Sequence, residues 1–294
     1  MDRRIENLRT GIQKADAVII GAGAGLSTAA GYVYSGERFE RYFADFRRKY
    51  GFQDMYSGGF YPYATPEEKW AFWSRNIWIN RYSGIPNGTY GDLLRLVQGK
   101  DYFVLTTNVD HCFQRAGFDK ARLFYTQGDY GLFQCSRPCC QTTWDNEAMV
   151  REMLLAQGFS IGEGGELIPP EGREPAMAIP GTLVPRCPNC GRPLTLNLRA
   201  DDTFVEDEGW HRAAAAYEAW LAAHREGAVV YLEIGVGYNT PGIIKFSFWQ
   251  QVYRNPRAVY ACLNMEEDPV PEQIQDRSIL LAGDAHRLIG ELLA

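Results

Sequence analysis

Four of the seven cysteines are spaced as ligands of a single metal ion. Cys135-x3-Cys139 forms one pair, and Cys187-Pro-Asn-Cys190-Gly forms a Cys-x2-Cys-Gly turn. Such a turn directs two thiolates at one tetrahedral ion, and a second pair completes the four ligands of zinc. Because protein would fill every position, the ion would be structural. Cys140 competes with Cys139 for one position, and buried free thiols are the alternative for the whole set.

A glycine-rich segment, Gly21-Ala-Gly-Ala-Gly-Leu-Ser27, follows the apolar run 17–20. Glycines at such a turn let backbone N–H groups approach a phosphate, and the start of a following helix favours negative charge. The dinucleotide-binding fingerprint would place a third glycine three residues after the second, where this sequence has Leu26. A tight turn without a ligand is therefore the alternative to nucleotide binding.

Polar residues follow the other apolar runs where each would end as a strand. They are Thr106-Thr-Asn-Val-Asp110 after 102–105, Gln127-Gly-Asp129 after 123–125, Glu233 and Gly235-Val-Gly237 at the end of 229–234, and Asn264 after 258–263. Parallel strands bring their carboxyl ends to one edge of a sheet, where α/β proteins bind ligands. Asn, Asp and Thr also serve as caps and turns, so it is the repetition that favours a site.

The elements that must position these residues alternate between strands and helices. The apolar runs predict buried parallel strands at 17–20, 102–105, 229–234 and 258–263, with a shorter one at 123–125. Helix-length segments separate them, beginning with an opening helix whose apolar face carries Ile5, Leu8 and Ile12. This alternation predicts an α/β fold: a Rossmann-like parallel-sheet domain with a smaller zinc-ribbon and helical module inserted.

Two segments do not fit the alternation. Residues 32–84 are crowded with aromatic side chains, with helical spacing at 39–46 and 67–79 and a loop at 56–64. Residues 135–225 hold most of the cysteines, a Gly/Pro-rich stretch and an alanine-rich helix near 212–224. We expect the two segments to form the small domain, with 32–84 as core or as a lid over a ligand. The Rossmann-like domain would then comprise residues 1–31, 85–134 and 226–294.

Composition disfavours several classes of function. Thirty Lys and Arg against 36 Asp and Glu give a net charge of −6, which provides no general attraction for nucleic acid or anionic lipid. No apolar run approaches the roughly 18 residues of a membrane-spanning helix, and the first residues do not resemble a signal peptide. Cysteines grouped for a metal favour a reducing compartment, so we expect a cytoplasmic protein.

In this order, the motifs resemble those of the sirtuins, a family of NAD-dependent protein deacylases and ADP-ribosyltransferases. Gly23-Ala-Gly-Leu-Ser-Thr-Ala-Ala-Gly31 is similar to the family's GAGxSxxxG motif, and Thr106-Thr-Asn-Val-Asp110 to its TQNID element. The cysteine pairs match its zinc ribbon, and 235–237 and Asn264 fall where the family has GTS and an adenosine-side asparagine. The resemblance runs from about residue 8 to the C-terminus.

The resemblance implies NAD+ as co-substrate and a structural Zn2+. It implies zinc ligation by Cys135, Cys139, Cys187 and Cys190. It implies NAD+ contacts at Gly23, Ala24, Gly25, Ser27, Thr28, Asn108, Asp110, Gln127, Gly235, Val236, Gly237 and Asn264.

Three departures from the family's motifs indicate a subgroup. Tyr32-Val-Tyr-Ser-Gly36 replaces the family's IPDFR, Gln127 replaces the catalytic histidine, and Asn197-Leu-Arg-Ala-Asp-Asp202 replaces an apolar peptide-binding segment. The chain thereby resembles the macrodomain-linked class of sirtuins more closely than the deacetylases. That resemblance implies mono-ADP-ribosylation of a lipoylated carrier protein, similar to the glycine-cleavage H protein. It also implies a functional link to a macrodomain hydrolase that removes the modification.

The implied catalytic residues are Asn108, Asp110 and Gln127. The first two would hold the ribose and the carboxamide of NAD+, and the carboxylate would stabilise the positive charge that develops as nicotinamide leaves. Glutamine forms hydrogen bonds but cannot take a proton at neutral pH, so transfer is favoured over deacylation. A residual NAD-dependent deacylase or delipoylase and a non-catalytic NAD-sensing module are the alternatives.

Overall fold

The computed structural model describes residues 2–294, so residue 1 of the first predicted domain lies outside the described part. The chain folds into two units. Of the described residues, the sheet unit contains 2–31, 86–127 and 208–294, and the insertion unit contains 32–85 and 128–207. Among the described helices, none combines the length and the apolar character that crossing a membrane requires.

Six parallel strands form the centre of the sheet unit, in the order β11-β10-β9-β1-β2-β3. The strands are β1 (Ala17–Ala22), β2 (Asp101–Thr106), β3 (Leu123–Tyr125), β9 (Val229–Ile234), β10 (Val259–Asn264) and β11 (Ser278–Ala282). Every residue of β1 and β9 is buried, as expected for central strands covered on both faces. The predicted α/β fold with a Rossmann-like parallel sheet is confirmed; only the edge strand β11 was not predicted.

The winding of the sheet changes direction at β1. The chain continues from β1 through β2 to β3 on one side, and from β9 through β10 to β11 on the other. The register pairs Ala22 with Thr106 in β2 and with Ile234 in β9, so the loops after these three strands begin at the same level. In open α/β sheets, ligands bind beyond the carboxyl ends of the strands beside such a reversal.

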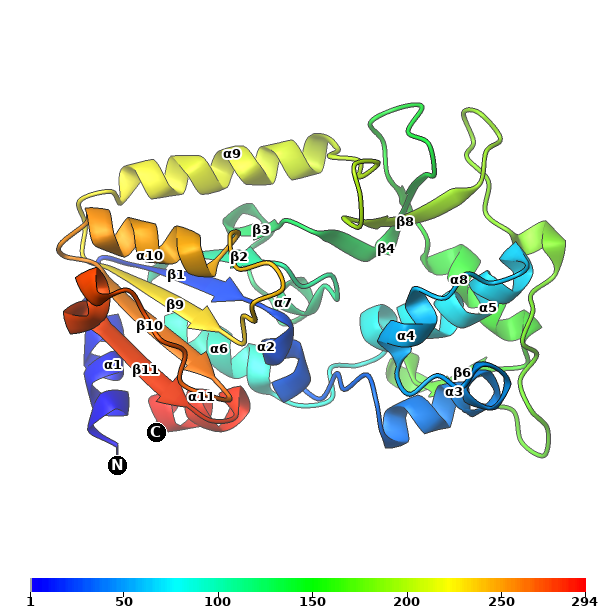
Figure 1. Cartoon of the computed structure of the whole chain (residues 1–294), viewed down its shortest axis with the longest axis horizontal. Helices are drawn as coiled ribbons and strands as arrows, with labels where there is room; N and C mark the ends of the chain where they lie inside the picture. The colour runs from blue at the N-terminus through cyan, green and yellow to red at the C-terminus, as the bar shows by residue number, and fades with distance from the viewer. Residues whose placement is uncertain (1) are drawn as a thin grey trace. The chain divides into compact units, whose positions relative to one another are not determined.

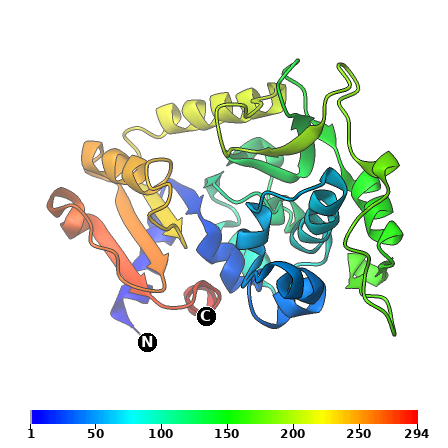
Figure 2. The same ribbon diagram turned by 45° about the vertical axis from the view of Figure 1, so that its right-hand side comes forward.

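Helices cover both faces of the sheet. The helices α9 (Glu208–Ala223) and α10 (Lys245–Arg254) pack on one face, and α1 (Arg3–Lys14), α6 (Thr89–Val97) and α11 (Ala285–Leu293) lie on the other (Figure 1, Figure 2). Short turns complete the unit: α2 (Ala24–Ala29), α7 (Cys112–Arg115), η2 (Lys120–Arg122) and η5 (Glu272–Arg277). The opening helix was predicted from Ile5, Leu8 and Ile12, and all three are buried in α1.

The insertion unit combines helices with a small antiparallel sheet. Its helices are α3 (Glu37–Tyr50), α4 (Met55–Gly59), α5 (Pro66–Ile77) and α8 (Glu147–Ala156), with a π-turn η1 (Trp78–Tyr82) and 3-10 turns η3 (Glu163–Gly165) and η4 (Gly181–Leu183). Strands β4 (Gly128–Cys135), β5 (Trp144–Asp145) and β8 (Leu194–Leu198) form a sheet in the order β5-β4-β8, and β6 (Ser160–Ile161) pairs with β7 (Leu167–Ile168).

The aromatic segment of the insertion unit forms two of the predicted helices and one that was not predicted. Helix α3 includes the predicted segment 39–46, and α5 covers the predicted segment 67–79 as far as Ile77, beyond which the π-turn η1 continues. The segment 56–64 is not wholly a loop, because α4 occupies its first residues, and the Asp54 carboxylate accepts a hydrogen bond of 2.7 Å from Ser57 N at its start. Phe43 and Phe72 lie with ring centroids 4.7 Å apart in the buried core, so much of the aromatic content serves packing.

Three boundaries differ from the predicted domains, the first only because residue 85 belongs to the insertion unit. Residues 128–134 belong to the insertion unit because β4 begins directly after Gln127 and pairs with β8. Residues 208–225 belong to the sheet unit because α9 packs on β2 and β3. Trp210 of α9 contacts Phe124 with ring centroids 5.0 Å apart, and Trp220 is buried in the same core. The alanine-rich helix therefore covers the sheet.

Candidate active site and metal centre

The glycine turn after β1 meets the loop after β9, backbone against backbone. Gly25 N–H donates to the carbonyl oxygen of Gly235 over 2.9 Å, and Gly23 N–H donates to that of Ile234 over 3.0 Å. A Cβ on Gly23 would lie 2.6 Å from the Gly235 oxygen, and a Cβ on Gly25 would lie 2.6 Å from the Gly235 Cα. Gly235 itself has φ +61°, which glycine adopts without strain. The structure thus brings three of the predicted glycines together.

The end of β2 positions Asn108 against this turn. The side-chain Nδ2 of Asn108 donates to the carbonyl oxygen of Gly23 over 2.9 Å, and its backbone N–H donates to Thr106 Oγ1 over 3.0 Å. The Thr106 hydroxyl donates in turn to the carbonyl oxygen of Ala22 over 2.9 Å. Thr106 was predicted as one of the polar residues at the end of its strand, but not as a catalytic or NAD+-contacting residue. It fixes the backbone that carries Asn108.

A buried chain of hydrogen bonds leads from Asn108 to Asp110. Ser27 Oγ lies 2.5 Å from Asp110 Oδ2 and 3.0 Å from the Tyr90 hydroxyl, which lies 3.5 Å from Asn108 Nδ2. The other carboxylate oxygen of Asp110 accepts from Cys112 N over 3.0 Å. Complete burial, with the nearby Asp110 carboxylate, raises the pKa of Tyr90 well above its ordinary value, so its hydroxyl remains a donor. The Asp110 carboxylate is therefore held in place from both sides.

Sequence reasoning missed Tyr90. It lies on α6 and is buried with Leu93 and Val97, at the spacing of an ordinary core face. The one available signal was its hydroxyl, because a buried tyrosine needs a hydrogen-bond partner. The partners, Ser27 and Asn108, come from other elements of the unit, and no local pattern names them.

We expect Tyr90→Phe to lower the rate of nicotinamide release roughly tenfold, because Ser27 and Asn108 lose a shared partner and the site is less firmly oriented. The free energy of unfolding should fall by about 1 kcal/mol, the usual effect of one hydrogen bond. Tyr102→Phe is the matched control, since its hydroxyl accepts one bond of 3.0 Å from Asp119 N. Equal rate losses in the two variants would contradict a role for Tyr90 in the site.

The loop after β2 is also unusual at His111. Among described residues other than glycine, His111 alone has a positive φ, at +64°. A residue other than glycine is strained in this left-handed backbone conformation, and such residues occur more often in functional loops. The turn at His111 begins α7, so that Asp110 accepts from the N–H of Cys112.

Gln127 lies beyond β3, level with Asn108 beyond β2. The register pairs Thr106 with Tyr125, and Thr126 N–H donates to the carbonyl oxygen of Thr106 over 2.9 Å. Gln127 and Asn108 therefore each follow a paired residue by two positions. The Gln127 Nε2 makes one long hydrogen bond of 3.4 Å to Thr126 Oγ1. Its side chain supplies an amide at this edge of the sheet. The amide donates and accepts hydrogen bonds but does not act as a base at neutral pH.

Asn264, at the end of β10, contacts the loop after β9. Its Nδ2 donates to the carbonyl oxygen of Val236 over 3.3 Å and to Asp268 Oδ2 over 3.1 Å. Its Oδ1 accepts from Met265 N–H over 3.0 Å. Asp268, which was not predicted, forms an ion pair of 2.8 Å with Lys245. Asn264 therefore ties the end of one strand to the loop that follows its neighbour.

The remaining residues predicted to contact NAD+ lie on α2 and in the loop after β9. Ala24 and Thr28 are exposed on α2, where the Thr28 hydroxyl donates to the carbonyl oxygen of Ala24 over 3.1 Å. Val236 is buried and Gly237 is exposed in the loop after β9. All the residues predicted to contact NAD+ belong to the sheet unit. They lie at the carboxyl ends of its strands, in the loops there, on α2 or, for Asn264, at the last residue of β10.

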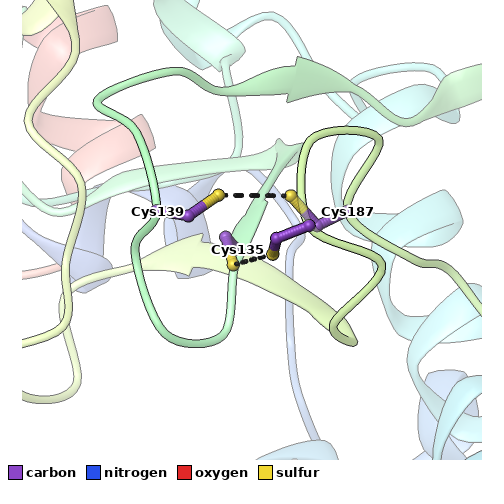
Figure 3. A group of neighbouring side chains, drawn as sticks. Cys135, Cys139 and Cys187 are labelled. Atoms are coloured by element: carbon purple, nitrogen blue, oxygen red, sulfur yellow. Dashed lines mark hydrogen bonds between the residues drawn. The ribbon is translucent and has the colours of Figure 1, made fainter.

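The four predicted metal ligands converge in the insertion unit. Cys135 Sγ lies 3.7 Å from Cys190 Sγ, and Cys139 Sγ lies 3.6 Å from Cys187 Sγ (Figure 3). All four sulfur atoms lie within 4.8 Å of one another. A tetrahedral zinc with Zn–S bonds of about 2.3 Å separates its sulfurs by about 3.8 Å. The cluster therefore fits zinc, and four protein ligands make such a site structural.

The structure decides between Cys139 and Cys140. Cys140 Sγ lies outside the cluster and accepts a hydrogen bond of 3.1 Å from Asn189 Nδ2. Burial raises the pKa of Cys187, but hydrogen bonds from the backbone of Cys190 and Asn189 outweigh that effect and lower the pKa to about 7.

We expect Cys190→Ser to reduce the zinc content from one ion per chain to nearly none, because a hydroxyl replaces one of four thiolates. Atomic emission of the purified protein measures the metal. Cys140→Ser is the matched control and should retain its zinc. Loss of zinc from Cys140→Ser alone would show that the ligand set is a different one.

The comparisons with known proteins agree with this geometry. The chain is 39% identical over 288 residues to a protein ADP-ribosyltransferase of Staphylococcus aureus, covering 98% of this chain and 86% of that protein. It is 30% identical over 296 residues to a probable bifunctional ADP-ribose hydrolase/ADP-ribosyltransferase of Fusarium oxysporum f. sp. cubense, covering 97% of this chain and 47% of that protein. The chain thus spans about half the length of the Fusarium relative.

The fold is that of the sirtuins. A solved Sir2 homologue in complex with NAD matches with a TM-score of 0.56 at 18% identity, covering 98% of this chain and 92% of that chain. No protein-family model matches the chain. The similarity to the Staphylococcus enzyme extends over nearly the whole sequence, and the fold similarity does the same. The chain belongs to the sirtuin-type protein ADP-ribosyltransferases.

Proposed function

We propose that this protein transfers ADP-ribose from NAD+ to a lipoylated carrier protein similar to the glycine-cleavage H protein, with release of nicotinamide. One observation carries the proposal: a fixed carboxylate, Asp110, and the amides of Asn108 and Gln127 lie at the carboxyl edge of the sheet, beside a glycine turn. A deacylase of this family would need a histidine in place of Gln127. The names of the two relatives support transfer.

The glycine turn fits the pyrophosphate of NAD+. Gly23 and Gly25 meet Gly235 without any intervening side chain, and their N–H groups donate to the end of β9 and the loop after it, so these glycines hold the turn in place. We infer that the phosphates approach the exposed backbone at Ala24, beside them. The exposed start of α2, at Ala24, and the exposed Gly237 lie on the two loops that make this contact. We infer that the adenosine half of NAD+ lies along the loop after β9 and that the nicotinamide half reaches Asn108 and Asp110.

Asp110 and Asn108 prepare the site for bond cleavage before substrate arrives. Two hydrogen bonds hold the Asp110 carboxylate, from Ser27 Oγ and Cys112 N, so it need not reorient as positive charge develops at the sugar carbon. The nicotinamide–ribose bond breaks with both electrons going to nicotinamide. A nucleophile of the carrier forms the new bond at that carbon and loses its proton to solvent.

The segment 197–202 favours a folded acceptor over an acyl-lysine peptide. Asn197 is buried, and its Nδ2 donates to Gln134 Oε1 over 2.8 Å and to the carbonyl oxygen of Val205 over 3.0 Å. Beyond it, Arg199 and Asp202 are exposed. Charged groups at this exposed end suit electrostatic docking of a partner protein better than contact with an apolar acyl chain.

The proposal is tested by incubating the protein with NAD+ and the lipoylated carrier and measuring the intact mass of the carrier. We expect the mass to increase by one ADP-ribose group, and the unlipoylated carrier to remain unmodified. Loss of the lipoyl group without addition of ADP-ribose would identify a delipoylase. Binding of NAD+ without release of nicotinamide would identify a sensing module.

Gln127→His tests the role of the amide. We expect this variant to gain hydrolytic deacylation of an acylated peptide, by up to about 100-fold over the wild type, because general-base help contributes about 100- to 10,000-fold when fully aligned. Deacylation is measured by the mass of the peptide. Gln127→Asn is the control, because it changes the side chain but keeps an amide. A wild-type protein that deacylates as well as Gln127→His would contradict the proposal.

The same reasoning suggests the setting of the reaction. We propose a functional link to a macrodomain hydrolase that removes the modification. The Fusarium relative supports such a link, because its name gives it both a hydrolase and a transferase activity. Four cysteines grouped as ligands of one zinc ion favour a reducing compartment, so we propose that the protein works in the cytoplasm.

A further inference from the structure

A buried ionic cluster lies behind the loop that follows β9. Lys245, the first residue of α10, places its Nζ 2.5 Å from Glu233 Oε1 and 2.8 Å from Asp268 Oδ2. The side chains of Lys245 and Glu233 are fully buried, and that of Asp268 is 16% exposed. The Tyr260 hydroxyl donates to Glu233 Oε2 over 2.8 Å. These four residues are the ionic cluster.

The ammonium group of Lys245 stays charged in this position. It lies 5.2 Å from the ring centre of Tyr238 and 5.9 Å from that of Trp249, both at distances of cation–π contact. Burial lowers the pKa of Lys245, but the carboxylates of Glu233 and Asp268 outweigh burial and raise this pKa to about 12.

The cluster is not a metal site. Ligand atoms of Glu233, Cys262 and Asp268 lie within 4.8 Å of one another, a spacing that a cation could bridge. Lys245 already bonds to both carboxylates from within this group. The protein's own cation therefore takes the place that a metal would have.

The cluster is connected to the predicted cofactor loop through one amide. Asp268 Oδ2 accepts from Lys245 and also from Asn264 Nδ2, and the same Nδ2 donates to the carbonyl oxygen of Val236. Both hydrogens of the Asn264 amide are thus directed within the protein, and Met265 N–H donates to its oxygen. Asn264 acts on the loop by holding it, and Lys245 and Asp268 hold Asn264.

Stability alone does not explain such a cluster. When well-packed apolar residues replace a buried ion pair, the protein is often equally stable or more stable. The ion pair, in contrast, fixes one conformation through its directional hydrogen bonds. The loop needs such fixing, because it turns at Gly235 with φ +61° and continues as exposed residues 237–240. The contact of Gly23 and Gly25 with Gly235 requires the loop to remain in this one conformation.

We propose that Lys245 is a positioning residue. Through Asp268 and Asn264 it holds the loop 235–237 in the conformation that the glycine turn requires, so that the cofactor's adenosine side meets a preformed surface. This inference rests on the proposed function for the identity of the ligand, NAD+. The state of the loop without ligand tests it independently.

The experiment compares Asp268→Asn with Asp101→Asn. Asp268→Asn keeps the size of the side chain and the Lys245–Glu233 pair. Asp101 is the matched control, because like Asp268 it accepts from a cation and from an uncharged side-chain N–H, here Arg122 Nη1 and Trp220 Nε1, each at 3.0 Å. It lies at the opposite end of the strands. We expect the NAD+ dissociation constant of Asp268→Asn to rise about tenfold, with its kcat within twofold of the wild type.

Hydrogen–deuterium exchange without NAD+ supplies the second readout. The backbone N–H groups of 235–238 should exchange at least about tenfold faster in Asp268→Asn and at the wild-type rate in Asp101→Asn. Unchanged exchange in Asp268→Asn, or equal acceleration in both variants, would overturn the inference. Wild-type protein that binds no NAD+ but shows the expected exchange difference would overturn the proposed function and leave the positioning role standing.

A second variant covers the case in which Asp268→Asn does not fold. Lys245→Met combined with Glu233→Gln removes the cation together with the most deeply buried carboxylate, so no fully buried charge loses its partner. The partly exposed Asp268 then has no cation to hold it. Faster exchange at 235–238 in this double variant supports the inference, and wild-type exchange overturns it.

Discussion

Asp110→Asn should lose nicotinamide release by about 100- to 1,000-fold, the usual effect of removing one preorganised electrostatic contact from a reacting centre. The asparagine keeps one oxygen for a hydrogen bond but has no negative charge to oppose the positive charge at the sugar carbon. The Asp110 carboxylate is held by Ser27 and Cys112 before substrate binds, so its effect does not depend on rearrangement. Binding of NAD+ should change far less than turnover.

Released nicotinamide, followed by chromatography, measures this effect, and calorimetry measures binding. Asp119→Asn is the control: Asp119 is an exposed carboxylate of the same unit that accepts from Ala121 N over 2.9 Å at the start of η2. This control should turn over at the wild-type rate. If Asp110→Asn retains more than a third of wild-type turnover, the carboxylate is not part of the chemistry.

Gly235→Ala should have the second large effect, on both binding and stability. Its Cβ would lie 2.4 Å from Leu26 N and 2.6 Å from Gly25 Cα, both backbone atoms, and φ is +61°. The two loops must separate, and the alanine must adopt a strained conformation or change it. We expect NAD+ affinity to fall by at least about tenfold and the free energy of unfolding to fall by roughly 1–3 kcal/mol.

Gly242→Ala is the matched control for this prediction. It lies seven residues further along the same loop, is exposed, and was not predicted to contact NAD+, and a Cβ there would meet nothing within 4 Å. Its NAD+ affinity and its melting temperature should stay close to those of the wild type. If Gly242→Ala weakens binding as much as Gly235→Ala, the loop is sensitive to any side chain and the close contact is not the cause.

Local patterns in the sequence predicted much of the sheet and the metal ligands. Buried parallel strands are nearly continuous apolar runs, and β1, β9 and β10 stand out for that reason. Edge strand β11 does not, because most of Ser278–Ala282 is only half-buried or exposed. The short helix α4 was missed because its Ser-Gly-Gly is typical of loops, although Asp54 was a usable capping signal.

The metal centre shows what the spacing of cysteines predicts and what only the folded chain decides. A Cys-x2-Cys turn predicts ligands because both thiolates come from one tight turn. The choice between Cys139 and Cys140 could not be made from spacing, since they are adjacent. It follows from the fold of the insertion unit, which directs the Cys139 sulfur toward Cys187 and places the Cys140 sulfur against Asn189.

By itself, the sequence determined which residue types follow each strand and therefore which side chains reach the carboxyl edge of the sheet. Only the tertiary structure decided what holds them there: Tyr90 behind Ser27 and Asn108, and Lys245 with Asp268 behind Asn264. The physical reason is the separation along the chain over which each kind of interaction acts. Periodicity and capping act over a few residues, whereas these hydrogen bonds join segments that are distant along the chain, and only chain folding brings their donors and acceptors together.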